Sequence, residues 1–237
     1  MRRPIDILSA GELLVDLITD DFVQTLDEAT LFKRVPGGSP ANLAMNMARL
    51  GNAAMLAACV GDDDMGGVLR NYVERVGVDI TYVTQVDEPT TLILVTRSSS
   101  VSNFQPYRGA DYQFSIRQFP FQRFEEISIF HTTCFALSKN PAQKTILKKA
   151  QEAHDLGCKL SIDLNYAKKL WKSQKKAFKV IKTYCQFNPL IKISEDDMLR
   201  LFEKELPHEE IFEFFHNQGV DMVCLTLGSK GVKLSQK

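Results

Sequence analysis

Residues 37–51 read GGSPANLAMNMARLG, and the interpretation of the whole chain starts from this stretch. The two adjacent glycines lack a Cβ, so the backbone there can approach a ligand closely. We expect Ser39 to cap a helix with Pro40 in its first turn, where proline's missing N–H costs nothing. Gly51 suits the left-handed residue that ends such a helix. Asn42 adds a donor and an acceptor at this helix start, which favours a small hydroxylated ligand over nucleic acid or membrane.

Length and composition indicate a globular chain with one main domain. The 237 residues are 44% hydrophobic and 24% charged, as in ordinary globular proteins, and they can bury a substantial core. Lys plus Arg and Asp plus Glu both number 29, so no overall field attracts nucleic acid or anionic lipid. The basic run within residues 168–176 is interpreted as a solvated helix face. We therefore expect no nucleic-acid partner and no membrane partner.

The cysteines and the N-terminal segment point to the cytoplasm. The five cysteines are scattered without the C-x-x-C spacing of zinc sites, and their odd number argues against a disulfide framework. Acidic residues interrupt the first twenty positions, where a secretory signal needs an apolar run. No apolar run approaches the length that spans a bilayer. We expect a cytoplasmic protein.

Apolar runs of strand length alternate with amphipathic segments along most of the chain. Strands are expected over residues 5–10, 53–60, 90–96, 104–107, 127–131, 159–164, 190–193 and 222–227. Helices are expected over residues 39–50, 65–76, 141–155, 173–186, 195–203 and 207–216. This alternation indicates βαβ units around a parallel sheet that is covered on both faces. The less regular residues 12–35 and 90–108, with a polar loop at 97–103, are expected to form a small β-rich flap.

Ligands of such sheets bind beyond the carboxyl ends of the strands, and several polar motifs fall there. Asp16 closely follows the first strand, and an ionised carboxylate there can accept bonds from two sugar hydroxyls. Taken alone, Asp16 is better explained as a solvated turn aspartate. Arg108 carries a guanidinium that can hold a carboxylate or a hydroxyl pair, with a surface arginine in a turn as the alternative.

Taken in order, these motifs resemble the ribokinase-like (PfkB) carbohydrate kinases, in their fructokinase and 2-keto-3-deoxygluconate kinase branch. The opening stretch resembles the family's N-terminal signature. DLNYAKKLW at residues 163–171 is similar to its Asp-x-Asn-Tyr-Arg-x-x-Leu-Trp block, and TLGSKG at 226–231 to its Thr-x-Gly-x-x-Gly turn. The resemblance implies a three-layer α/β/α sandwich with a mostly parallel central sheet. It also implies a small β-rich lid inserted at about residues 12–35 and 90–108.

The resemblance further implies ATP-dependent phosphorylation of a small sugar hydroxyl, with ATP and Mg²⁺ as cofactors. A homodimer through the lid is a further expectation. The sugar side would comprise Asp16, Gly37, Gly38, Asn42 and Arg108. The ATP side would comprise Asp163, Asn165, Lys192, Thr226, Gly228 and Gly231. Asp197 would hold Mg²⁺ through water.

Two departures from the family pattern bear on the substrate and the metal. Ala167 stands where the family has an arginine, which removes a bidentate grip and favours a neutral sugar such as fructose. Ser194 and Asp197 stand where the family has asparagine and glutamate, so oxygen atoms are kept but their reach changes. An acidic helix start stabilised by the helix dipole is the alternative explanation of residues 195–197.

One block of the family does not occur in this sequence. Family members carry a later Gly-Ala-Gly-Asp, whose aspartate is the general base and whose helix N-terminus forms the anion hole. No Gly-x-Gly-Asp occurs among the 237 residues. We expect a C-terminally truncated kinase that lacks the C-terminal part of the fold, has no catalytic residue in this chain and turns over little. The alternative is a non-catalytic sugar-binding or regulatory remnant of a sugar kinase.

Overall fold

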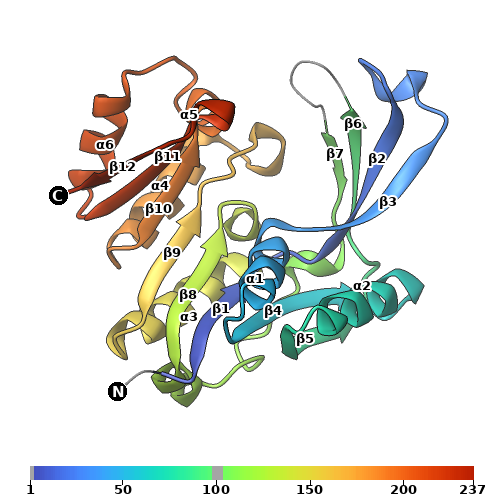
Figure 1. The fold of residues 1–237 in the computed structure, drawn as a ribbon, viewed down its shortest axis with the longest axis horizontal. Helices are drawn as coiled ribbons and strands as arrows, with labels where there is room; N and C mark the ends of the chain where they lie inside the picture. The colour runs from blue at the N-terminus through green and yellow to red at the C-terminus, as the bar shows by residue number, and fades with distance from the viewer. Residues whose placement is uncertain (1–2, 98–103) are drawn as a thin grey trace.

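An eight-stranded sheet forms the body of the computed structural model, which describes residues 3–97 and 104–237 (Figure 1). Its order is β12-β11-β10-β9-β8-β1-β4-β5, and every neighbouring pair is parallel except β11 and β12. The strands are β1 (Ile5–Ala10), β4 (Ala54–Gly61), β5 (Asp79–Val86), β8 (Ile127–Thr133), β9 (Lys159–Asp163), β10 (Leu190–Ser194), β11 (Met222–Thr226) and β12 (Val232–Gln236).

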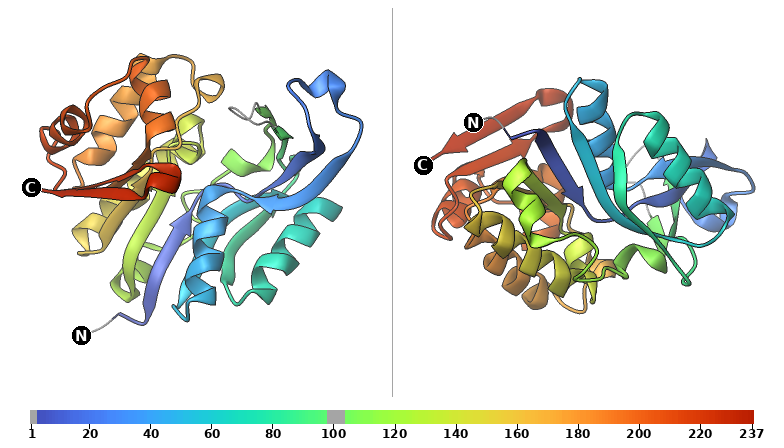
Figure 2. Two further views of the ribbon diagram at one scale, coloured as in Figure 1. Left: turned by 45° about the horizontal axis from the view of Figure 1, so that its top comes forward. Right: turned by 90° about the horizontal axis from the view of Figure 1, so that it is seen from below.

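Helices cover this sheet on both sides, which confirms the predicted three-layer α/β fold. Helices α1 and α2 lie on one face, and α3, α4 and α6 lie on the other (Figure 2). The helices are α1 (Ser39–Arg49), α2 (Asp64–Arg75), α3 (Ala142–Asp155), α4 (Gln174–Cys185), α5 (Glu195–Phe202) and α6 (His208–His216). Among the described residues, no helix combines the length and apolar character needed to cross a membrane.

A second, four-stranded sheet projects from the body in the order β3-β2-β6-β7 (Figure 1). Its strands are β2 (Leu14–Phe22), β3 (Phe32–Gly37), β6 (Leu92–Arg97) and β7 (Phe104–Tyr107). Strand β2 pairs antiparallel with β3 and parallel with β6. The strands come from the segments predicted to form a lid, and the lid role itself stays a prediction. Most of the polar loop predicted over 97–103 lies outside the described residues.

Strand β4 shows how the core forms on both sides of the main sheet. All eight of its residues are buried, as expected for a central parallel strand. Because successive side chains point to opposite faces, Leu56 and Val60 join the apolar cluster beneath α1 and α2. Met55 and Cys59 join the larger cluster on the other face. A continuous apolar run thus places β4 between two helical layers.

Helix α1 begins differently from the sequence prediction. Ser39 was expected to be the cap, but Gly38 occupies that position and Ser39 is the first helical residue. The Ser39 hydroxyl instead donates to the Asp163 carboxylate at the end of β9, at 3.0 Å. Pro40 does lie in the first turn. Gly51 does adopt a left-handed backbone, with φ of 84°.

Two edge strands of the main sheet had no counterpart in the sequence prediction. Strands β5 and β12 each carry mixed polar and apolar residues, because an edge strand packs less of its surface than a central one. Strand β12 turns back after β11 and is antiparallel to it. Such short, amphipathic strands become identifiable only through the neighbour with which they pair.

Candidate functional site

A cavity of about 490 Å³ lies between the carboxyl edge of the main sheet and the second sheet. The second sheet contributes Asp16 from β2 and apolar side chains from β6 and β7. The start of α1 contributes Gly38 and Asn42. The region after β9 contributes Asn165, and α5 contributes Asp197. Segments far apart in sequence therefore enclose one cavity with polar and apolar walls, at the edge where parallel sheets bind ligands.

The two glycines at the start of α1 are required by close packing. A Cβ on Gly37 would overlap the carboxylate of Asp16, which stands on the neighbouring strand β2. A Cβ on Gly38 would overlap the backbone carbonyl of Glu12, and Gly38 has φ of 105°. Any other residue at either position would displace these groups. The glycines thus let Asp16 and Asn42 face the same cavity.

Glu12 is a buried carboxyl group that sequence reasoning did not select. Its Oε1 accepts from the backbone N–H of Ser39 at 3.3 Å, and its Oε2 accepts from the Thr133 hydroxyl at 2.8 Å. Burial raises the pKa of Glu12 to about 8. Glu12 therefore joins the end of β1 to α1 and β8. Its place directly after Gly11, the glycine that follows β1, was the available signal.

Asp16 is the carboxylate of the cavity with the clearest access to a ligand. Burial raises the pKa of Asp16 to about 6, so it is largely ionised at neutral pH. Its oxygens can then accept hydrogen bonds from ligand hydroxyl groups. Asn42 lines the same cavity and adds an amide that can donate and accept.

Arg108 lies behind the cavity wall. Its Nε donates to Asp111 at 2.9 Å and its Nη1 donates to Ser138 at 2.6 Å. Its guanidinium also stacks over the ring of Phe135, 4.3 Å from the centroid, and Phe135 lines the cavity. The ion pair with Asp111 is almost fully buried, which explains why this arginine is not a free surface group. A direct contact of Arg108 with the sugar remains a prediction.

The residues predicted for the ATP side follow the ends of β9, β10 and β11. Asp163 and Lys192 face each other across β9 and β10 and form an ion pair at 2.9 Å. Thr226, at the end of β11, pairs in register with Ser194 of β10. Ser39 links this row to the cavity through its bond to Asp163. The two predicted groups are therefore adjacent along one sheet edge.

The turn after β11 is open to solvent. Gly228 and Gly231 have φ of 56° and 99°, which disfavours other residues. A Cβ at either position would meet no atom within 4 Å. The space above this turn is therefore available to a ligand that approaches the backbone.

Asn165 and Asp197 line the same cavity as Asp16. The sequence analysis expects Asn165 to contact ATP and Asp197 to hold Mg²⁺ through water. The Asn165 Oδ1 accepts from the Phe135 N–H at 3.0 Å. Asp197 accepts from the Ser194 hydroxyl at 2.5 Å, and burial raises the pKa of its carboxyl. No group of three or more His, Cys, Asp or Glu side chains within residues 3–97 and 104–237 could hold a metal ion.

Glu12 generates a testable pH dependence of stability. Its folded pKa of about 8 lies above the ordinary value of 4.5, so folding takes up a proton between these pH values. The contribution of Glu12 to the free energy of unfolding should be fully present below about pH 4.5 and fall as the pH rises toward 8, by up to about 1.4 kcal/mol per pH unit. Glu12→Gln stays neutral and should flatten this slope between pH 5 and 8 in urea unfolding.

The matched control is Glu74→Gln on the exposed side of α2, which should keep the wild-type slope. Identical slopes for wild type and Glu12→Gln would show that Glu12 is ionised in the folded protein.

Known proteins are similar to this chain in sequence and in fold. The family model described as pfkB family carbohydrate kinase matches residues 5–237. An ATP-dependent 6-phosphofructokinase of Thermoanaerobacterium thermosaccharolyticum is 33% identical over 233 residues, which cover 98% of this chain and 72% of that protein. The structure of Halothermothrix orenii fructokinase superposes with a TM-score of 0.90 at 31% identity, and the match covers 98% of this chain and 82% of that one.

A structure solved with ATP is also similar. It is an uncharacterized sugar kinase from Pyrococcus horikoshii in complex with ATP, with a TM-score of 0.83 at 26% identity. The match covers 98% of this chain and 74% of that one. The sequence match over nearly all of this chain, together with the shared fold, shows that it belongs to the pfkB family of carbohydrate kinases.

Proposed function

We propose that this site serves ATP-dependent phosphorylation of a hydroxyl group on a small neutral sugar. The observation that carries the proposal is the adjacency of two different sites on one sheet edge. The cavity around Asp16 and Asn42 offers acceptors and donors for hydroxyl groups. The row formed by Asp163, Lys192 and the open turn after β11 offers a cation and accessible backbone.

The charges in the cavity favour a neutral sugar over a sugar phosphate. Three carboxyl groups line it, those of Glu12, Asp16 and Asp197. Arg200 is the one basic residue among the described lining residues, and its Nη1 lies 3.4 Å from Asp197. Glu12 is largely neutral at pH 7, but the largely ionised Asp16 would repel a phosphate group, whereas hydroxyl groups can donate to its carboxylate. We therefore infer a fructokinase-like substrate, in agreement with Ala167 where the family has an arginine.

The residues of the neighbouring row fit a nucleotide phosphate and its Mg²⁺. Lys192 is partly exposed and could approach an anion, and Gly228 and Gly231 leave their backbone accessible. Bound ATP would supply the phosphoryl group. Asp197 would hold Mg²⁺ through water, since this ion keeps several of its waters in proteins. Asp163 holds Lys192 through an ion pair and accepts a hydrogen bond from the Ser39 hydroxyl.

Asp16 provides a direct test of the sugar site. Asp16→Asn should weaken fructose binding about ten- to hundredfold, because hydrogen bonds to a charged group contribute about 1.5–3 kcal/mol. In the wild type, fructose affinity should rise between pH 5 and 7, because the carboxyl of Asp16 ionises at a pKa of about 6. Calorimetric titration measures both effects.

Asp21→Asn is the control, since Asp21 stands exposed near the end of the same strand. Equal fructose affinities for Asp16→Asn and wild type would remove Asp16 from the sugar site.

We further propose that these 237 residues bind sugar but catalyse little transfer. Phosphoryl transfer depends on positioning and charge stabilisation at the reacting atoms, and no Gly-x-Gly-Asp occurs in this sequence to supply them. A coupled assay should detect little fructose-dependent ADP release from this chain. Ordinary turnover would contradict the proposal. An in-frame Gly-Ala-Gly-Asp after codon 237 would favour the kinase over the non-catalytic alternative.

A homodimer through the second sheet is also proposed. Phe22 and Leu31 are each 65% exposed, and Val35, which pairs with Asp16 further along β2 and β3, is 39% exposed. Large exposed apolar side chains along one sheet favour an interaction surface. Light scattering after gel filtration should show a dimer for wild type and a monomer for Phe22→Ser with Leu31→Ser. Leu50→Ser, at a residue 77% exposed after α1, is the control and should stay dimeric. A monomeric wild type would refute the dimer.

A further inference from the structure

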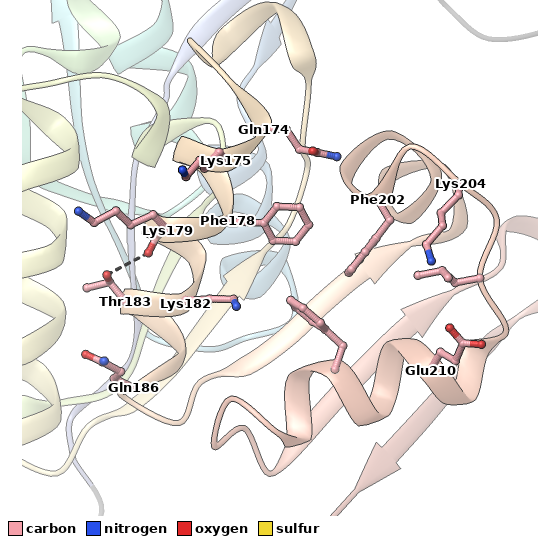
Figure 3. Close-up of a pocket in the computed structure, with 12 residues that line it drawn as sticks. Gln174, Lys175, Phe178, Lys179, Lys182, Thr183, Gln186, Phe202, Lys204 and Glu210 are labelled. Atoms are coloured by element: carbon pink, nitrogen blue, oxygen red, sulfur yellow. Dashed lines mark hydrogen bonds between the residues drawn. The ribbon is translucent and has the colours of Figure 1, made fainter.

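A groove of about 960 Å³ lies among helix α4, helix α6 and the segment around the end of α5 (Figure 3). It shares no lining residue with the candidate sugar cavity. Its volume falls near the upper end of clefts that hold small molecules, about 300–1,000 Å³. The groove is therefore a separate feature of the molecule, and the proposed kinase function does not account for it.

Three phenylalanines form the apolar floor of the groove. Phe178 packs edge-on against Phe202 at 5.4 Å and against Phe214 at 5.8 Å between ring centroids. Phe202 and Phe214 are 5.1 Å apart in the same manner. All three rings are only partly buried, so part of their surface faces the groove. In Figure 3, Phe178 and Phe202 extend toward each other from α4 and α5. Such rings favour contact with another flat aromatic group.

Lysine side chains stand at the sides of this aromatic floor. Lys182 and Lys204 approach the phenylalanines from opposite walls (Figure 3). Lys182 also lies over the Phe214 ring, 5.7 Å from its centroid. Lys175 and Lys179 add two further ammonium groups along α4, while the groove has a single acidic lining residue. In the described part of the chain, no carboxylate forms an ion pair with any of these four lysines.

Helix α4 carries several lysines close together, and their mutual repulsion destabilises the helix. The helix contains four lysines and no acidic residue, although the whole chain has no net charge. Lys175 and Lys179 are four residues apart, and Lys179 and Lys182 are three apart, so like charges adjoin on the helix surface and destabilise it. A bound anion would offset this repulsion. The sequence interpretation of a solvated helix face covered only the basic run within residues 168–176, and such a face does not account for the aromatic floor.

We propose that this groove binds an organic anion with a flat aromatic body. The ring would rest on Phe178, Phe202 and Phe214, and the anionic group would lie within reach of Lys182 and Lys204. The phenylalanines would select for the aromatic body, and the ammonium groups would select for its negative charge. Neither part alone would bind with comparable affinity.

The test uses 1-naphthyl phosphate as the probe and the full 237-residue protein. Naphthalene fluorescence should report saturable binding that weakens with added salt. Lys182→Gln with Lys204→Gln should raise the dissociation constant at least about fivefold, because charge-assisted contacts are lost. Inorganic phosphate and 1-naphthol, tested separately, should each bind at least about tenfold more weakly than the probe.

Lys144→Gln with Lys148→Gln is the matched control. It removes the same charge from two exposed lysines of α3 and should leave the affinity unchanged. The proposal is overturned if both double variants bind the probe as wild type does, which would place the probe elsewhere. It is equally overturned if inorganic phosphate binds as tightly as 1-naphthyl phosphate.

Discussion

The buried carboxyl group of Glu12 connects the elements that surround the candidate cavity. It stands just after β1 and bonds to the first residue of α1 and to Thr133 at the end of β8. The backbone carbonyl of Glu12 lies so close to Gly38 that a Cβ at this position would overlap it. The buried acid and the glycine turn are therefore one structural unit. Because burial favours the neutral form of this carboxyl, the unit contributes hydrogen bonds without a full buried charge.

The parallel sheet places this unit beside two features of the same sheet edge, the acidic cavity and the glycine turn after β11. Carboxyl ends of β8, β9 and β10 lie side by side, and the register sets Thr133 opposite Asp163 and Asp163 opposite Lys192. The acidic cavity lies on one side of this row and the open glycine turn on the other. Ser39 connects them, since its N–H bonds to Glu12 and its hydroxyl to Asp163. A sugar and a nucleotide bound in these two places would be neighbours.

Much of this arrangement could be predicted from motifs. The positions of Asp16 and Asn42 in one cavity, and of Lys192 and Thr226 along one sheet edge, follow from where each motif stands relative to its strand. The prediction that Ser39 caps its own helix was wrong, because its hydroxyl bonds to a carboxylate 124 residues away. The sugar contact of Arg108 stays a prediction, and its motif did not indicate the buried ion pair with Asp111.

The alternation of strands and helices and the order of the motifs could be predicted from the amino-acid sequence alone. These are local properties, because the hydrophobic period depends only on residues close together in the chain. The need for glycine before α1 is a tertiary property, since the missing Cβ atoms make room for Asp16 and for the Glu12 carbonyl. The tertiary structure alone decided which edge strands pair, which carboxyl is buried and raised in pKa, and what Arg108 contacts. It also decided that the lysines of α4 border an aromatic groove formed with α5 and α6. These properties depend on burial and on contacts between distant residues, which come into existence only when the chain is folded.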